Sequence, residues 1–288
     1  MGQFKILNYL NTYFTGGIMN MEVIGYSERG VINSLIYNIF YSENNLEKIK
    51  RFLSMICLPN LENIENNIII SDFSNINNAK ILIEQSFSDF GDCDIVILVE
   101  KNINSETVKQ AIFIEAKVKT DSIKSWSIEK EYKEFDKFRE KKENGVKVYD
   151  STLFSQLYSK IMLVESIKQG ISEKTCNEGF WAKRGKPRKI GENKVVRKAF
   201  EKIKEYCEND DNLFITIFPD NIKNMIKFFE NNNQWWPLCE KSHCIERFNS
   251  NYSQRCGFIP WESIMGFCRQ NDLTDAINVL EFNEGQIY

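Results

Sequence analysis

The chain of 288 residues is 42% hydrophobic and 27% charged, with a formal net charge of −3. A chain of this length buries a sizeable core without disulfides, and the composition is that of an ordinary globular protein. No apolar run reaches the about 18 residues of a membrane span, the N-terminus lacks the basic and apolar regions of a signal peptide, and the eight cysteines form no CxxC pair. We therefore expect a cytoplasmic protein with free thiols and no membrane partner.

The first half of the chain predicts two helices followed by short strands. Apolar residues recur at helical spacing over residues 27–40, and a second helix is predicted over 45–56. Glu28 precedes the first apolar positions by three and four residues, so we expect its side chain on the same inward face. Runs rich in β-branched residues predict strands over residues 68–70, 81–83, 95–99 and 111–118.

The second half predicts mainly helices. Residues 119–149 are dense in both charges and predict an exposed helical insertion. The remaining predicted elements are a helix over 152–168, a helix near 193–207, a strand over 213–218 and a helix over 220–230. We expect one domain over 1–230, with a core at about 27–220, and a Trp-, Cys- and Asn-rich extension over 231–288 packed on it. The fold class is then α/β (an α+β mixed sheet), in the order helix, three strands, helix, strand, with helical decorations.

Polar residues lie at the end of an apolar hairpin predicted within residues 90–119. If its strands pair about a centre near residue 105, opposed residue numbers sum to about 210, which sets Asp94 across from Ala116. Glu115 and Lys117 flank that point and, two residues apart, share a face. Burying unpaired carboxylates costs several kcal/mol or forces their protonation, and a bound divalent cation removes that penalty. Oxygen ligands favour Mg²⁺ or Mn²⁺.

The same residues form a recognisable motif. Asp94, followed about twenty residues later by Glu115-Ala116-Lys117 on a predicted strand, resembles the signature of the PD-(D/E)XK nuclease superfamily, which includes restriction-endonuclease-like and RecB-like nucleases. The sequence departs from the motif at Cys93, which stands in the position of its proline. That proline is structural, so we do not expect its absence to abolish activity.

Two further residues extend the resemblance. Glu28 is similar to the acidic residue that many members carry on the helix preceding the strands. Gln156 resembles the glutamine of the RecB-like and restriction-enzyme-like branches. The predicted order of elements over residues 27–220 is also similar to the core of that family.

The resemblance implies a hydrolase of phosphodiester bonds, an endonuclease dependent on Mg²⁺ or Mn²⁺, acting on DNA in restriction or antiviral defence. It implies that the metal is held by Asp94, Glu115, the carbonyl group of Ala116, and Glu28 directly or through water. Lys117 would orient or deprotonate the attacking water, or offset developing negative charge. Gln156 would position the water or a phosphate.

Several alternatives stay open at this point. Glu-x-Lys alone is a very common tripeptide, and on a strand edge it forms a surface ion pair. Asp92 is a second candidate for the aspartate of the motif. The protein could be a non-catalytic member that binds nucleic acid or another protein, and RNA could replace DNA as the substrate. A protein partner or a homo-oligomer leaves no signature in the sequence.

The most basic stretch is a candidate nucleic-acid contact. Residues 181–204 hold ten Lys or Arg residues against two Glu residues. Gly185 and Pro187 predict that part of this stretch is a loop, where phosphates could be reached. The residues we assign to phosphate contact are Lys183, Arg184, Lys186 and Arg188. The alternative is a solvated helix face.

Other chemistries are less favoured. His243 is the only histidine, which argues against nucleases and Ser-His-Asp hydrolases that need a catalytic histidine. It could bind zinc together with Cys239, Cys244, Cys256 and Cys268, but the spacing matches no zinc finger. The tryptophans could stack on bases, although aromatic residues more often build a core.

Overall fold

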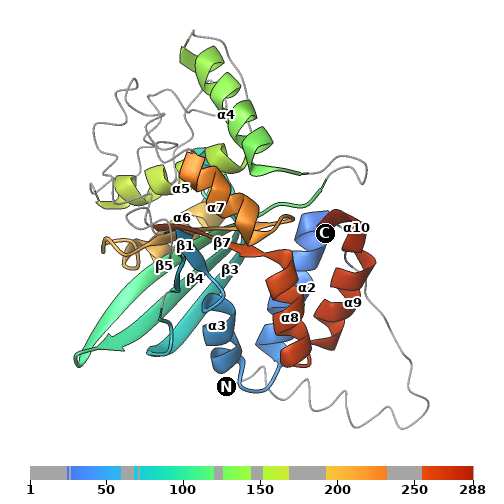
Figure 1. The fold of residues 1–288 in the computed structure, drawn as a ribbon. Coiled ribbons are helices and arrows are strands. Elements are labelled where there is room, and N and C mark those ends of the chain that lie inside the picture. Colours follow the sequence, from blue (N-terminus) through green and yellow to red (C-terminus); the bar gives the residue numbers. More distant parts are fainter. Residues whose placement is uncertain are drawn as a thin grey trace.

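The computed structural model describes residues 25, 27–59, 68–70, 72–119, 126–143, 152–168, 193–231 and 255–287. Within these residues the strands form one seven-stranded mixed sheet, ordered β2-β1-β7-β6-β5-β4-β3. Among the helices of the same residues, none combines the length and apolar character needed to cross a membrane. The α/β class with a mixed sheet is therefore confirmed (Figure 1).

A three-stranded antiparallel meander forms the part of the sheet that ends at one edge. It consists of β3 (Ile76–Ser86), β4 (Asp92–Ile103) and β5 (Glu106–Ala116). Two parallel strands continue the sheet from β5, namely β6 (Leu213–Phe218) and β7 (Cys256–Pro260). The short strands β1 (Cys57–Pro59) and β2 (Ile68–Ile70) pair antiparallel beyond β7.

One layer of helices covers the first face of the sheet. It consists of α2 (Ser27–Tyr41), α3 (Asn45–Leu53), α8 (Trp261–Gln270), α9 (Thr274–Phe282) and α10 (Glu284–Ile287). Their buried residues pack on alternate residues of the central strands, such as Ile95 and Ile97 of β4 and Ile112 and Ile114 of β5. This alternation follows from the two-residue period of a strand. In Figure 1, α2, α8 and α9 stand together to the right of the meander.

The second layer covers the opposite face. It consists of α4 (Ile128–Glu143), α5 (Leu153–Lys168), α6 (Lys194–Lys204), α7 (Ile222–Asn231) and the 3₁₀ turn η2 (Ser88–Phe90). Val96 and Leu98 of β4 and Phe113 of β5 face this layer. The strands β4 and β5 are thus buried on both faces, which explains their nearly continuous apolar sequence.

The β4–β5 turn corrects the predicted register. Asn104 and Ser105 both have left-handed φ angles, 51° and 68°, and Ile103 pairs with Glu106, so the turn has two residues. Ile95 therefore pairs with Ile114. Continuing this register sets Asp94 opposite Glu115, one residue away from the Ala116 that the sequence predicted.

The predicted elements differ from the structure mainly in their extent and partners. The helix expected over 45–56 ends at Leu53, and the strand expected over 81–83 is part of the eleven-residue β3. The predicted strand over 68–70 lies at the far edge of the sheet from β3, so it is not part of the meander. Beyond residue 231, β7 adds a strand between β6 and β1 that the sequence analysis did not predict.

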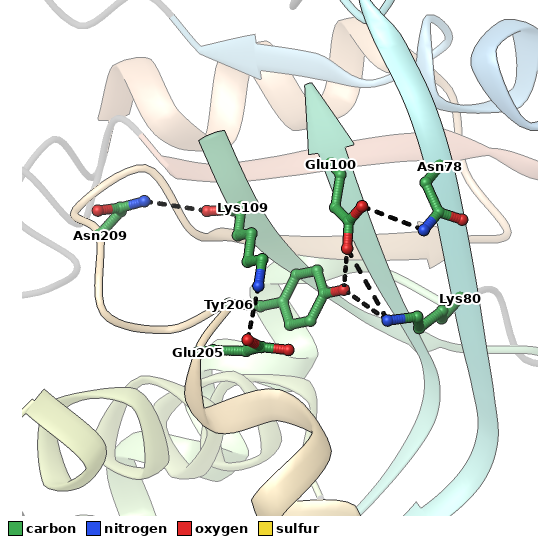
Figure 2. A network of polar contacts seen from close by, with 7 residues as sticks. All are labelled: Asn78, Lys80, Glu100, Lys109, Glu205, Tyr206 and Asn209. Carbon is green, nitrogen blue, oxygen red and sulfur yellow. Dashed lines mark hydrogen bonds and ion pairs between the residues drawn. The ribbon is translucent and has the colours of Figure 1, made fainter. Parts of the chain in front are cut away.

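A polar network fastens the chain after α6 to the meander (Figure 2). The hydroxyl group of Tyr206 donates to Glu100 Oε1 at 2.7 Å and accepts from Lys80 Nζ at 2.9 Å. Lys109 pairs with Glu205 at 2.6 Å. Glu100 lies six residues along β4 from Asp94, a distance of roughly 20 Å in a strand. The C-terminal end of α6 is therefore held at the end of the meander away from Asp94.

Candidate functional site

Asp94 lies at the beginning of β4, where a backbone hydrogen bond fixes its carboxylate. The amide of Ala116, the last residue of β5, donates to Asp94 Oδ2 at 2.8 Å. Asp94 is half-buried, whereas Asp92 is exposed on the same strand. Of the two candidate aspartates, Asp94 is therefore the one that the hairpin orients toward Glu115.

Glu115 is completely buried and forms an ion pair that the sequence analysis did not predict. The ammonium of Lys160, on α5, lies 3.1 Å from Glu115 Oε1, and their side chains are 1% and 0% exposed. Lys160 also donates to the carbonyl oxygen of Phe90 at 3.1 Å. Neither carboxylate oxygen of Glu115 has a hydrogen-bond partner of good geometry among the described residues. The Lys160 ammonium is therefore an ion-pair partner of Glu115, on the side of Oε1.

Lys117 follows β5 directly, and both of its backbone groups are held. Its amide donates to the carbonyl of Ile217 in β6 at 2.8 Å, and its carbonyl accepts from Trp261 Nε1 at 2.9 Å. Trp261 is buried in the core, so this tryptophan positions the motif rather than offering a stacking surface. The charge of Lys117 acts on both Glu28 and Glu115, because it lowers the pKa of each carboxyl group.

Glu28 joins Asp94, Glu115 and Lys117 from the first helix layer, on the other face of the sheet from Lys160. It lies in the first turn of α2, and its carboxyl group shares a hydrogen bond with Asp94. Burial raises the pKa of Glu28 to about 8, with further contributions from Asp94 and Glu115 and an opposing one from Lys117. The protonated form of Glu28 is therefore favoured at neutral pH, and its hydroxyl group donates a hydrogen bond to Asp94.

The ionisation of Glu115 depends on burial and on Lys160. Burial raises the pKa of Glu115 to about 7, while the ammonium of Lys160 opposes this rise. Burial by itself lowers the pKa of Lys160, but the charge of Glu115, its hydrogen bond and the neighbouring Cys93 and Asp94 together outweigh burial, so the pKa lies above its usual value. Lys160 is therefore protonated, and Glu115 is balanced between its two forms near neutral pH.

Glu84 holds the beginning of α2 in place beside Asp94. It belongs to β3 and adopts a left-handed φ of 48°, which is unusual for a residue with a side chain. The register places it between the pairs Ile83–Ile95 and Gln85–Cys93, hence across from Asp94. Its carboxylate accepts from Asn33 Nδ2 at 2.9 Å and lies 3.4 Å from Arg29 Nε. Both partners are on α2, and Arg29 adjoins Glu28.

The donor set fits a hard divalent cation. Among the described residues, no three His, Cys, Asp or Glu side chains already form a metal-ligand group. Mg²⁺, however, is usually bound through one or two carboxylates and keeps several waters. Asp94 and the unpaired Glu115 Oε2 supply two such carboxylates, and Glu28 supplies a third once its proton leaves. The two buried carboxylate oxygens of Glu115, neither with a hydrogen-bond partner among the described residues, are the observation that favours a cation here.

Gln156 lies one helical turn before Lys160, on the same face of α5. Its Oε1 atom is buried and has no hydrogen-bond partner among the described residues. Lys160 itself could have been found from the sequence, because it stands three residues after the inward Leu157 and four before the inward Val164. A lysine on such an apolar stripe signals a buried partner.

Most of the remaining predicted residues lie outside the part of the chain that the structure describes. Lys183, Arg184, Lys186 and Arg188 lie outside the described residues. So do His243, Cys239 and Cys244 of the possible zinc group. Cys256 and Cys268 are free thiols, and they are buried in the cores on opposite faces of the sheet. These two cysteines therefore do not share a metal.

Comparisons with known proteins add no assignment. The chain matches no protein-family model, no curated protein and no solved structure. Its candidate function therefore rests on the residues and geometry described above.

Proposed function

We propose that the protein is a metal-dependent nuclease that hydrolyses phosphodiester bonds in DNA, with a site similar to that of the PD-(D/E)XK superfamily. The observation that carries the proposal is the convergence of Glu28, Asp94, Glu115 and Lys117 from three separate segments. A surface Glu-x-Lys ion pair would not bury its glutamate completely, as Glu115 is buried here.

The order of elements supports the same proposal. Helix α2 precedes the meander β3-β4-β5, and α5 precedes β6, which lies parallel beside β5. If α3, β1, β2, α4 and α6 are set aside, these elements follow the helix, three strands, helix, strand order that the resemblance implies, with the motif at the ends of β4 and β5. The strands β1, β2 and β7 extend that order on the other side of β6.

Each side chain has a defined part in the proposed reaction. A bound divalent cation would supply charge neutralisation at the phosphate and lower the pKa of bound water. Asp94 and Glu115 would hold it, with Glu28 and the carbonyl of Ala116 as further ligands. Lys117 orients the attacking water or offsets the charge that develops on the phosphate. Gln156 positions the water or a phosphate oxygen from α5.

The test is cleavage of single- and double-stranded DNA, and of RNA, with Mg²⁺ or Mn²⁺ and then with EDTA. We expect DNA cleavage that requires the metal and stops in EDTA. Asp94→Ala should abolish it, while Asp92→Ala, the matched control at the exposed first residue of the same strand, should not. Cleavage that continues unchanged in EDTA contradicts the mechanism. No cleavage of any substrate favours the non-catalytic alternative, a protein that binds nucleic acid or another protein.

A further inference from the structure

Lys160 is the buried charge at the site to which the proposed reaction assigns no part. It is as buried as Glu115, and the two are joined at 3.1 Å. Removing two charges from water carries a large desolvation penalty, which their attraction seldom offsets in full. An apolar pair would fill this part of the core without that penalty. The presence of the ion pair therefore points to a role for Lys160 beyond packing.

Lys160 places a fixed positive charge on the Oε1 side of Glu115. The ammonium is fixed from two sides, because it also contacts the carbonyl of Phe90 at 3.1 Å. It lies 3.1 Å from Oε1 in an ion pair, while neither carboxylate oxygen of Glu115 has a hydrogen-bond partner among the described residues. Two-metal nucleases hold their ions about 3.5–4 Å apart. A second ion bound through Oε1 would meet the Lys160 ammonium in the space it needs.

The charges of the site lead to the same result. Glu28, Asp94 and Glu115 bring three carboxylates, and Lys117 and Lys160 bring two ammonium groups. The fully ionised group has one net negative charge, which one divalent cation more than neutralises. A second divalent cation would leave an excess of positive charge in a buried setting, and repulsion there is strong.

We infer that Lys160 restricts the proposed site to a single divalent cation by occupying the Oε1 side of Glu115. This inference rests on the proposed function and adds the number of metal ions and the residue that sets it. Lys160 is a positioning residue here, because it acts on the cation through Glu115. Its ammonium takes the place that a second metal ion would otherwise fill.

The experiment counts Mn²⁺ ions bound per chain by equilibrium dialysis and by electron paramagnetic resonance, where two neighbouring ions give a coupled spectrum. The wild-type protein should bind one uncoupled ion. Lys160→Ala removes the ammonium group beside Glu115 Oε1 and the Phe90 carbonyl, so this variant should bind two Mn²⁺ ions. Lys168→Ala, which removes a lysine two turns later on the same helix, should still bind one.

Each outcome decides the matter. Two coupled ions in the wild-type protein overturn the inference and leave the proposed function intact. No bound ion at all overturns the proposed function and the inference with it. A folded Lys160→Ala protein that binds one ion shows that Lys160 does not set the number. If circular dichroism shows that this variant does not fold, the number of ions bound by the wild-type protein decides for or against the inference.

Discussion

At the scale of single residues, the site differs from a simple cluster of acids because every carboxylate has a different environment. Asp94 accepts a hydrogen bond from the amide of Ala116, and Glu115 forms an ion pair with Lys160. The protonated carboxyl group of Glu28 is hydrogen-bonded to Asp94. This arrangement lets three buried or half-buried acids coexist without a cation. Because the environments differ, we expect substitutions at this site to affect metal binding, cleavage rate and stability to different degrees.

Lys117 is the residue whose loss should separate catalysis from metal binding. Lys117→Ala leaves the carboxylates in place, so calorimetry should give a metal affinity close to that of the wild type. Single-turnover cleavage should nevertheless slow by on the order of 10²-fold or more, the usual scale for a positioned acid–base or electrostatic group. Lys117→Arg should not restore the full rate, because a guanidinium is wider and stays protonated.

Either of two results would remove Lys117 from the mechanism. Cleavage by Lys117→Ala at the wild-type rate makes the lysine a mere ion-pair partner. Loss of the fold together with the metal makes it structural, since Lys117 links β5 to β6 and to Trp261 through its backbone.

The raised pKa values predict how the stability of the metal-free protein depends on pH. The pKa of Glu28 is about 8 and that of Glu115 about 7 in the folded protein, against an ordinary value of 4.5. The folded state therefore holds protons that the unfolded state releases, so stability is lost as the pH rises from about 5 to about 8. Thermal melting in EDTA should show a falling Tm over this range.

Two comparisons test whether the titration of Glu28 and Glu115 causes the fall in Tm. Glu28→Gln stays neutral at every pH, so its Tm should fall less steeply than that of the wild type. Excess Mg²⁺ should raise the Tm more at pH 8 than at pH 5, because the ligands are deprotonated only at the higher pH. Equal slopes for wild type and Glu28→Gln would show that Glu28 does not titrate in this range.

At the scale of elements, Glu84 determines where α2 begins relative to β4. A left-handed residue in a strand is strained, and such strain persists only where the surroundings impose it. Glu84→Ala keeps the strain but removes both contacts to α2, so unfolding should become easier by about 1–3 kcal/mol. Because Glu28 adjoins Arg29, the cleavage rate should fall as well.

The measurement is denaturant unfolding and cleavage on the same samples. Asn77→Ala is the matched control, since it removes an exposed hydrogen bond from the same strand, 2.7 Å long, at the end away from Asp94. Glu84→Gln keeps an acceptor for Asn33 and should retain most of the rate. A loss of stability in Glu84→Ala with an unchanged rate would separate Glu84 from the site.

The sequence predicted elements well where periodicity is long and clear. The helix expected over 27–40 is α2 with one more residue, and the strand expected over 213–218 coincides with β6. It missed β1 and β7, which are short and contain Pro59, Gly257 and Pro260, residues that ordinarily indicate turns. Their pairing comes from tertiary contacts, which a local pattern does not contain.

The sequence predicted that Asp94, Glu115 and Lys117 lie close together, but it did not predict the contacts among them. Spacing alone brought Asp94 and Glu115 together, because two paired strands leave few arrangements. The register was wrong by one residue, since only the positive φ angles of Asn104 and Ser105 define a two-residue turn. The pairing of Lys160 with Glu115 was missed because the two residues lie 45 positions apart in the sequence, so no local spacing connects them.

At the scale of the whole molecule, the basic stretch of residues 181–204 is the candidate contact with the DNA backbone. Its last eleven residues form α6, whose end lies away from Asp94. Replacing Lys183, Arg184, Lys186 and Arg188 by Gln together should weaken DNA binding and flatten its salt dependence, because each lost phosphate contact reduces the slope by about 0.9. Fluorescence titrations at several salt concentrations measure this.

A control variant with the same change in net charge distinguishes direct phosphate contacts from the overall electrostatic attraction between protein and DNA. The exposed lysines Lys194, Lys198, Lys202 and Lys204 of α6 can be replaced by Gln in the same number. We expect them to change the salt slope less. Equal slopes in the first variant and the wild type would make the stretch a solvated surface.

The most direct test of the central claim is a crystal of the protein soaked in Mn²⁺, with data collected at a wavelength where manganese scatters anomalously. The account predicts one anomalous peak between Asp94 and Glu115, within about 2.0–2.3 Å of a carboxylate oxygen of Asp94 and of Glu115 Oε2. Glu115→Ala crystals treated in the same way should lose it. Density for manganese elsewhere, with none between Asp94 and Glu115 in the wild type, would contradict the proposal that these two residues hold the catalytic cation.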